Sequence, residues 1–212
     1  MAAFESSAHN ACVVVMEMQS GHIAGVVGLQ AECFPPPFPA ELLWKPQHLR
    51  SHLEAFPEGQ FVAMEDTTVV GSASALLIGE DAWAAHLPWE KVTGGHHFSS
   101  HDPRGTTLYG ADVSVHPDRR LQGIARGLYH ARFELVRKSG LRRYGTACRI
   151  PGYSASSAPS PEEYCQDVAA GAKTDPTLTP LVRMGCRFVA VAHGYMDDPE
   201  SAHCAAVLEW LP

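Results

Sequence analysis

A short stretch of basic and small residues has the composition of an anion-binding turn. Arg120, Gly123 and Ala125 lie close together, and Arg119 and Arg126 flank them. A glycine lets the backbone come close to a ligand, and the free N–H groups at a helix start carry about half a positive charge. Such a turn binds phosphate groups. It is neither a Walker loop nor the GxGxxG fingerprint of dinucleotide-binding proteins.

The flanking sequence predicts the elements that would hold this turn. Residues 107–115 are rich in apolar and β-branched side chains, and Pro117 ends that strand pattern because it has no N–H to donate. From Ile124 apolar residues recur at helical spacing to about Ser139, and Gly140 suits the position beyond a helix C-terminus. A strand therefore leads through the basic turn into a helix.

The rest of the chain alternates between strand and helix patterns, and residues 79–106 fit neither. A long irregular stretch is typical of a functional or a disordered loop. With the strand, turn and helix described above, the predicted order of elements along the chain is β-α-α-β-β-β-α-β-α-β-β. This is an α/β (α+β) chain, and we expect it to form a single domain over residues 1–212. The further strands are predicted over 12–18, 60–66, 69–79, 142–149, 187–196 and 203–210, and the further helices over 20–33, 46–55, 161–170 and 175–184.

Composition excludes several classes of protein. The net charge is −7 and 45% of residues are hydrophobic, which disfavours nucleic acid and anionic membranes as partners and provides enough apolar residues for a core. No apolar run is long enough to span a bilayer, and the N-terminus has no secretion-signal pattern. The six cysteines include no CxxC pair and are typical of reduced thiols, so we expect a cytoplasmic protein.

A histidine-rich segment raises the alternative of a metal site. His96, His97 and His101 lie within six residues of one another, but no carboxylate or cysteine partner has ligand spacing. A polar loop that happens to be rich in histidine explains them more simply, and we assign no metal ligand.

The turn and its surroundings resemble a known family. Val115-His116-Pro117-Asp118, followed by Arg120-x-x-Gly123-x-Ala125, is similar to motif A of the GNAT N-acetyltransferases, where Arg/Gln-x-x-Gly-x-Gly/Ala holds the pyrophosphate of acetyl-CoA. From Trp89 to Trp210 the chain also resembles a GNAT subgroup sometimes fused to a carbon–nitrogen hydrolase, although Cys186 stands where that subgroup usually has an aromatic residue. The resemblance implies the GNAT fold, a mixed and twisted sheet of about seven strands flanked by about four to five helices.

The resemblance also implies which residues bind the acyl donor, acetyl-CoA. Backbone groups of Val113 and Val115 would meet the pantetheine amides. The pyrophosphate would lie against the turn formed by Arg120, Leu121, Gln122, Gly123, Ile124, Ala125 and Arg126.

Candidates for proton transfer follow from the same comparison. Asp112 lies near the place where the family keeps an acidic residue or a water relay, and Tyr109, His116 and Glu163 are alternative bases. The family often uses a tyrosine after the fifth strand as the acid, which favours Tyr164 over Tyr153. Arg149-Ile150-Pro151 replaces the family's frequent asparagine, so Arg149 could bind an acidic substrate group or a CoA phosphate.

The sequence therefore predicts an N-acyltransferase that moves an acetyl group from acetyl-CoA to a primary amine by direct attack in a ternary complex. The acceptor is a small-molecule or peptide amine, and Trp83, Trp89 and Tyr153 would favour an amine with an apolar part. A catalytically idle CoA-binding module and a metal-binding protein using His96, His97 and His101 are the alternatives. Dimers are frequent in the family, which leaves a homodimer open.

Overall fold

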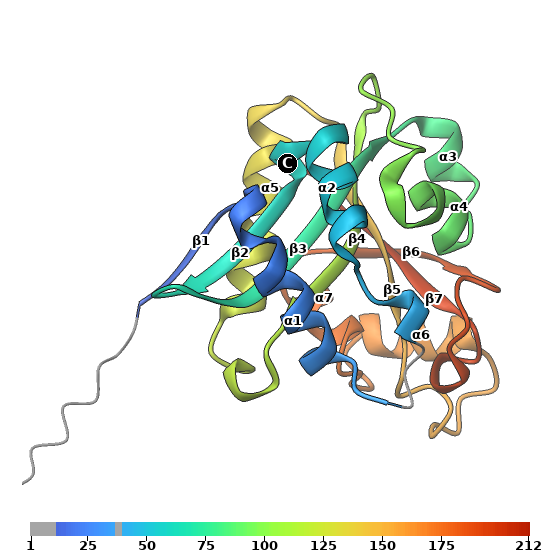
Figure 1. Cartoon of the computed structure of the whole chain (residues 1–212). Coiled ribbons are helices and arrows are strands. Elements are labelled where there is room, and N and C mark those ends of the chain that lie inside the picture. The colour runs from blue at the N-terminus through green and yellow to red at the C-terminus, as the bar shows by residue number, and fades with distance from the viewer. Residues whose placement is uncertain (1–11, 37–39) are drawn as a thin grey trace, which may run out of the picture.

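One mixed sheet of seven strands forms the centre of the molecule (Figure 1). The computed structural model describes residues 12–36 and 40–212, so the amino-terminal stretch in which we predict no secretion signal lies outside the described residues. The spatial order is β1-β2-β3-β4-β5-β7-β6, and every neighbouring pair is antiparallel except β4 with β5. The strands are β1 (Val13–Glu17), β2 (Gln60–Glu65), β3 (Thr68–Ile78), β4 (Thr107–Val115), β5 (Arg143–Arg149), β6 (Arg187–Ala192) and β7 (Ala205–Trp210).

Helices cover both faces of the sheet. In Figure 1, α1 and α2 cross in front of the strands and α5 lies behind them. The described part of the chain holds more helices than the sequence predicts, because residues 79–106 form two short ones. The helices are α1 (Ile23–Cys33), α2 (Pro46–Ala55), α3 (Glu80–Ala84), α4 (Trp89–Thr93), α5 (Ile124–Lys138), α6 (Pro161–Ala169) and α7 (Leu178–Arg183).

Helices α3 and α4 correct the prediction of an irregular stretch. Each has five residues, too few for a 3.6-residue periodicity to show in the sequence. Acidic residues in the first turns, Glu80 and Asp81 in α3 and Glu90 in α4, suit the positive end of a helix. A tight turn over Gly94–Phe98 follows, with His96 at a positive φ of 68°.

The core is divided between the two faces of the sheet, and β3 contributes to both. Leu76 and Ile78 pack in the cluster that includes α1 and α2, whereas Ala75 and Leu77 pack in the cluster that includes α5, α6 and α7. Successive side chains of a strand point to opposite faces, so a strand covered on both sides reads as a continuous apolar run. We call these two sides the α1 face and the α5 face.

Strands β4 and β5 separate towards their carboxyl ends. They pair in parallel only between Thr107–Gly110 and Arg143–Thr146, although β4 continues to Val115 and β5 to Arg149. Beyond these pairs neither strand bonds to the other, and the gap leaves backbone groups of both strands available to a ligand.

A bulge and a buried arginine shape the start of this gap. Strand β4 has one extra residue, Ala111, opposite the step from Ser74 to Ala75 on β3. The Arg132 side chain of α5, 1% exposed, donates from Nη2 to the carbonyl oxygens of Ser74 and Asp112. Arg132 therefore ties α5 to the bulge.

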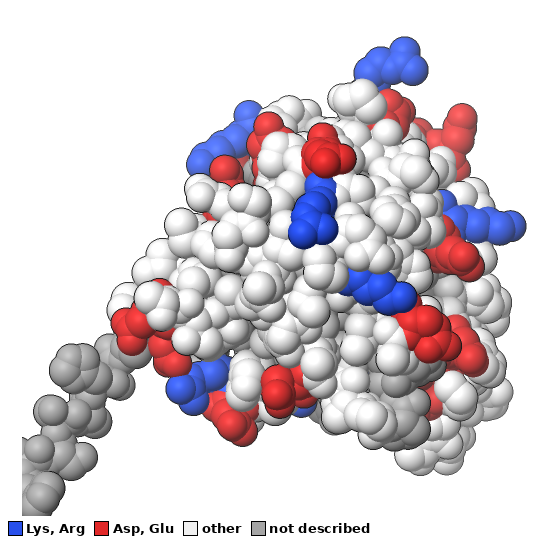
Figure 2. Space-filling model, in the orientation of Figure 1, with Lys and Arg blue, Asp and Glu red and all other residues white. Residues whose placement is uncertain are grey.

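Charge is interspersed rather than clustered on the face of the molecule shown in Figure 2. Figure 2 shows acidic and basic side chains interspersed among uncharged ones on the face that carries α1 and α2. No helix within residues 12–36 and 40–212 is both long enough and apolar enough to cross a membrane. The charges that bear on the site below are those inside the sheet gap.

Candidate active site

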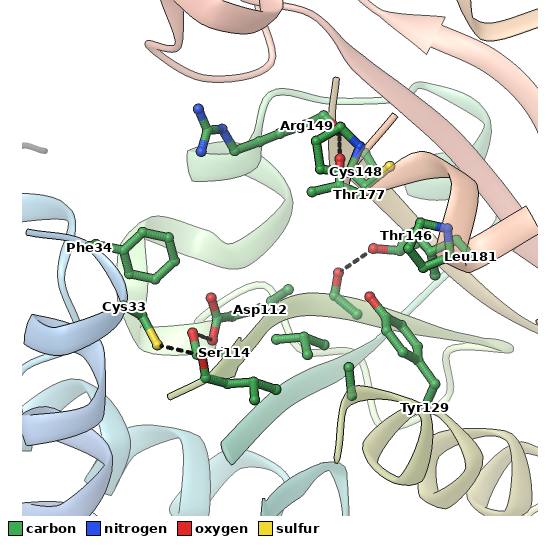
Figure 3. A pocket seen from close by; sticks show the side chains of 18 of the residues that line it. Cys33, Phe34, Asp112, Ser114, Tyr129, Thr146, Cys148, Arg149, Thr177 and Leu181 are labelled. Carbon is green, nitrogen blue, oxygen red and sulfur yellow. Dashed lines mark hydrogen bonds between the residues drawn. The ribbon is translucent and has the colours of Figure 1, made fainter. Parts of the chain in front are cut away.

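A cavity of about 620 Å³ lies where β4 and β5 separate (Figure 3). Its lining comes from both faces of the sheet, so it reaches from one face to the other through the gap between the strands. The α1 face contributes Gln30, Cys33, Phe34, Leu42, Trp44, Trp89 and Met196, and the α5 face contributes Ala125, Arg126, Tyr129, Leu181 and Met184.

The basic turn opens at the α5 end of this cavity. Gly123 has a φ of 84°, and a Cβ placed on it would meet no atom within 4 Å. Glycine is thus needed for the backbone conformation, and the space above it is open. Leu121 also has a positive φ, 62°, and its side chain is fully exposed. The free N–H groups of the first turn of α5 begin directly after Gly123.

The predicted donor-binding residues do not all reach the cavity with their side chains. Val113, Val115, Arg120, Ala125 and Arg126 line it. Leu121, Gln122 and Gly123 stand in the exposed turn at its edge, and Ile124 points its side chain into the core. The last four could offer only backbone groups. Arg119 turns away from the cavity to form an ion pair with Glu65, with Nη2 2.8 Å from Oε2.

Asp112 lies on the α1 face of the gap, where it is partly buried. Its Oδ2 accepts hydrogen bonds from Ser114 Oγ at 3.1 Å and from Gln30 Nε2 at 3.2 Å. Burial raises the pKa of the Asp112 carboxyl above its ordinary value, against the lowering effect of the Arg132 charge. A carboxylate with a raised pKa is a better proton acceptor than an exposed one.

Tyr164 lies away from the cavity. It belongs to α6, is 2% exposed, and its hydroxyl donates to Asp175 Oδ2 at 2.9 Å. It is not among the described residues that line the cavity. The same Asp175 carboxylate accepts hydrogen bonds from the backbone amides of Gly152, Thr177 and Leu178. Through Asp175, Tyr164 ties α6 to the segments around Gly152 and Thr177, and its hydroxyl is not placed at the cavity.

Tyr129 of α5 lines the cavity and points its hydroxyl towards the gap. Figure 3 shows Tyr129 beside Thr146 on one side of the cavity and Asp112 beside Ser114 on the other. Within the described residues the Tyr129 hydroxyl has no hydrogen-bond partner, and burial raises its pKa well above the ordinary value. The hydroxyl therefore keeps its proton and is free to donate it to a ligand.

Arg149 lies at the end of β5 with its guanidinium already paired. Nε and Nη2 bind the two oxygens of Asp198, each at 2.6 Å, and Nη2 also lies 2.9 Å from Glu200 Oε2. Two carboxylates therefore face one arginine, so this part of the rim carries a net negative charge.

Comparison with known proteins identifies the family. Residues 23–156 match the model of the Acetyltransferase (GNAT) family. This chain belongs to the GNAT acetyltransferase family. It is 37% identical to the uncharacterized N-acetyltransferase YkwB of Bacillus subtilis, over 89% of this chain and 84% of that protein. It is therefore an acetyltransferase homologue, as predicted.

A second relative supports the predicted subgroup. The probable hydrolase YhcX of Bacillus subtilis is 34% identical over 93% of this chain, but the match covers only 38% of YhcX. The match to part of a larger probable hydrolase agrees with the resemblance to GNAT domains fused to a carbon–nitrogen hydrolase.

Solved structures confirm the GNAT fold. The loading GNATL domain of CurA from Lyngbya majuscula has a TM-score of 0.81 at 17% identity, covering 94% of this chain and 98% of that one. The GNAT-like decarboxylase GphF, solved with isobutyryl-CoA, has a TM-score of 0.72 at 20% identity, covering 93% and 98%. At such identities the likeness concerns the fold alone.

The histidines of the segment have other partners in the structure. His101 accepts a hydrogen bond from the Leu77 amide, whereas His96 and His97 pack near His48 of α2. No group of three histidine, cysteine or acidic side chains within the described ranges is arranged to hold a metal ion. In this GNAT chain the segment instead supports the aromatic wall of the cavity, where His96 packs edge-on against Trp44 and Trp89.

Other sequence candidates also lie outside the cavity lining. Trp83 packs against Gly145, and Tyr153 packs against Tyr164. The Tyr109 hydroxyl bonds to that of Tyr195 at 2.8 Å in the core. Tyr129 was missed in the sequence because its position on α5 fits the apolar periodicity of that helix. The sequence signal that could have found Tyr129 is its place: it carries a hydroxyl and follows Leu128 on the helix that begins at the anion-binding turn.

Proposed function

We propose that this chain transfers the acetyl group of acetyl-CoA to the primary amine of a small molecule or peptide by direct attack in a ternary complex. The observation that carries the proposal is a cavity through the sheet gap, with Asp112 on one face and the Tyr129 hydroxyl on the other. Direct transfer requires the two reactants to enter from different sides and meet at the gap.

The donor would bind on the α5 face. The free amides of the first turn of α5, with Arg120 and Arg126, suit a pyrophosphate. The edge of β4 at Val113 and Val115, which pairs with no other strand, suits the pantetheine amides, with the Val115 carbonyl also accepting from Cys33 Sγ. These contacts leave the thioester at the gap between β4 and β5, beside Tyr129.

The acceptor would approach from the α1 face, where Asp112 takes its proton as the amine nitrogen attacks the thioester carbonyl. As the C–S bond breaks, the Tyr129 hydroxyl donates its proton to the leaving sulfur, which yields the amide and free CoA. Because Asp112 and Tyr129 lie on opposite sides of the cavity, they can act on the incoming nitrogen and on the departing sulfur in one geometry. Tyr164 has no part in this scheme.

Amine-dependent loss of the acetyl-CoA thioester tests the proposal. A panel of primary amines should produce N-acetyl products by mass spectrometry, in amounts equal to the thioester consumed. Binding of acetyl-CoA without turnover on any amine would instead support the catalytically idle CoA-binding module.

A further inference from the structure

The acceptor side of the cavity is walled mainly by apolar and aromatic side chains. It consists of Phe34, Leu42, Trp44, Trp89, Tyr195 and Met196, which we call the acceptor wall. Trp44 and Trp89 lie with ring centroids 5.5 Å apart. The Trp89 indole donates from Nε1 to the Ala111 carbonyl at 3.0 Å, which fixes that ring against the bulge of β4.

The three histidine rings behind this wall carry no positive charge at neutral pH. The Trp44 ring packs edge-on against His48, His52 and His96. Burial lowers the pKa of His48 to about 4 and that of His52 to about 3, and it also lowers the pKa of His96. These three rings are neutral at pH 7. Lys45, Glu90 and His97 also lie near this cluster, as sources of electrostatic interaction with its rings.

The charges on the acceptor side favour a cation. Asp112 is the one acid among the described residues that line the cavity. Arg149, which also lines it, is neutralised by Asp198 and Glu200 and has one carboxylate in excess beside it. Arg120 and Arg126 stand at the other end, at the basic turn. Arg132, which also lines the cavity, belongs to α5 and donates from Nη2 to the carbonyl oxygens of Ser74 and Asp112. An ammonium group is attracted to a carboxylate and to the faces of tryptophan rings. Arg132 comes from α5 and its Nη1 and Nη2 are already bonded within the protein, so a carboxylate would find no arginine with free terminal nitrogens on the α1 face.

We propose that the acceptor is a cationic primary amine on an apolar or aromatic body, with no carboxylate beside the amine. The acceptor wall holds the apolar body, and Asp112 pairs with the ammonium group. The ammonium first loses one proton to solvent, and Asp112 takes the second proton when the neutral amine attacks the thioester carbonyl. This inference rests on the proposed acetyl transfer.

Three amines separate the elements of this proposal. 2-Phenylethylamine has the expected body and charge, L-phenylalanine adds only a carboxylate, and 1,4-diaminobutane replaces the aromatic body with a second cation. The kcat/KM for 2-phenylethylamine should exceed that for each of the other two by about tenfold or more.

Variants of the wall test where the aromatic body binds. Met196→Asn should raise the KM for 2-phenylethylamine about tenfold while the Kd for acetyl-CoA stays unchanged. Val189→Asn is the matched control, because Val189 is an exposed residue of β6, 42% exposed, that is absent from the cavity lining. It should leave both constants as in the wild type.

Each outcome supports or overturns the proposal. Equal or better acetylation of 1,4-diaminobutane or L-phenylalanine would overturn the acceptor class while leaving acetyl transfer intact. An unchanged KM in Met196→Asn would remove the acceptor wall from the binding site. Binding of acetyl-CoA without acetylation of any amine would refute the transferase itself, and the acceptor class with it.

Discussion

Replacing Tyr129 and Tyr164 separately with phenylalanine distinguishes the two candidate acids. The Tyr129 hydroxyl has no hydrogen-bond partner within the described residues, so Tyr129→Phe should change the free energy of unfolding by only about 0.5 kcal/mol. General acids contribute about 10²–10⁴-fold to rate. The raised pKa of Tyr129 makes it a weak acid. We therefore expect kcat to fall by about 10²-fold, or about 3 kcal/mol.

Tyr164→Phe should show the opposite pattern. The substitution removes a buried hydrogen bond of 2.9 Å to Asp175 Oδ2, which still accepts from the Gly152 amide at 3.0 Å. Loss of one partner from a carboxylate that keeps others should cost about 1–2 kcal/mol of folding free energy. For a chain of this size that lowers Tm by roughly 2–8 °C. The kcat of the folded variant should remain near the wild-type value.

Thioester absorbance and thermal unfolding measure the two effects independently. Absorbance is preferable to a thiol-reactive dye, because all six cysteines of the chain are free. The reasoning is refuted if Tyr164→Phe loses turnover at unchanged Tm while Tyr129→Phe behaves as the wild type. In that case the sequence-based assignment of Tyr164 as the acid would be the better one.

Three further substitutions test the electrostatics. Asp112→Asn should lower kcat/KM by about 10²-fold and abolish the decrease of kcat/KM at low pH. In urea unfolding at pH 7 the variant should be more stable than the wild type, because a carboxyl whose pKa is raised in the folded state destabilises the fold as pH rises past its ordinary value of 3.8. Arg132→Met should lower the free energy of unfolding by about 2–4 kcal/mol in urea, since the Ser74 and Asp112 carbonyls lose their donor. Because the Arg132 charge lowers the pKa of Asp112, the same variant should lose kcat/KM at a higher pH than the wild type. An unchanged pH dependence would contradict this effect of Arg132 on Asp112. The pKa of His52 is about 3 when folded and 6.5 when unfolded, so the unfolded state binds more protons as pH falls below 6.5. His52→Phe should therefore remove about 2 kcal/mol of the stability loss between pH 7 and pH 5, and equal losses in both proteins would refute this.

The anion-binding turn could be predicted from the sequence because its chemistry is local. The strand ending before Pro117, the glycine at position 123 and the periodic helix from Ile124 are each signalled by neighbouring residues. The structure has strand, turn and helix at those positions. The strand order along the chain and the GNAT fold followed from the same periodicities and the resemblance. That residues 1–212 form one domain, and that two copies form a dimer, stay predictions.

Two features depend on tertiary structure and could not be predicted. The choice between Tyr129 and Tyr164 depends on where α5 and α6 lie relative to the gap, and neither helix pattern carries that information. Asp112 was predicted to lie near the chemistry, but its partners Gln30 and Ser114 come from α1 and from β4 itself, and Gln30 is 82 residues away.

Helices α3 and α4 were missed because five residues are too short for a periodic signal.

Isothermal titration with acetyl-CoA tests the central claim, that the turn at Gly123 binds the acyl donor. The wild type should bind with a Kd on the order of micromolar, and Gly123→Glu should abolish binding because it places bulk and negative charge against the pyrophosphate. Gly140→Glu is the matched control: Gly140 also has a positive φ, 61°, with open space around it, but it lies past the C-terminus of α5. Wild-type affinity in Gly140→Glu and none in Gly123→Glu would support the account. Undiminished binding in Gly123→Glu, or no binding by the wild type, would contradict it.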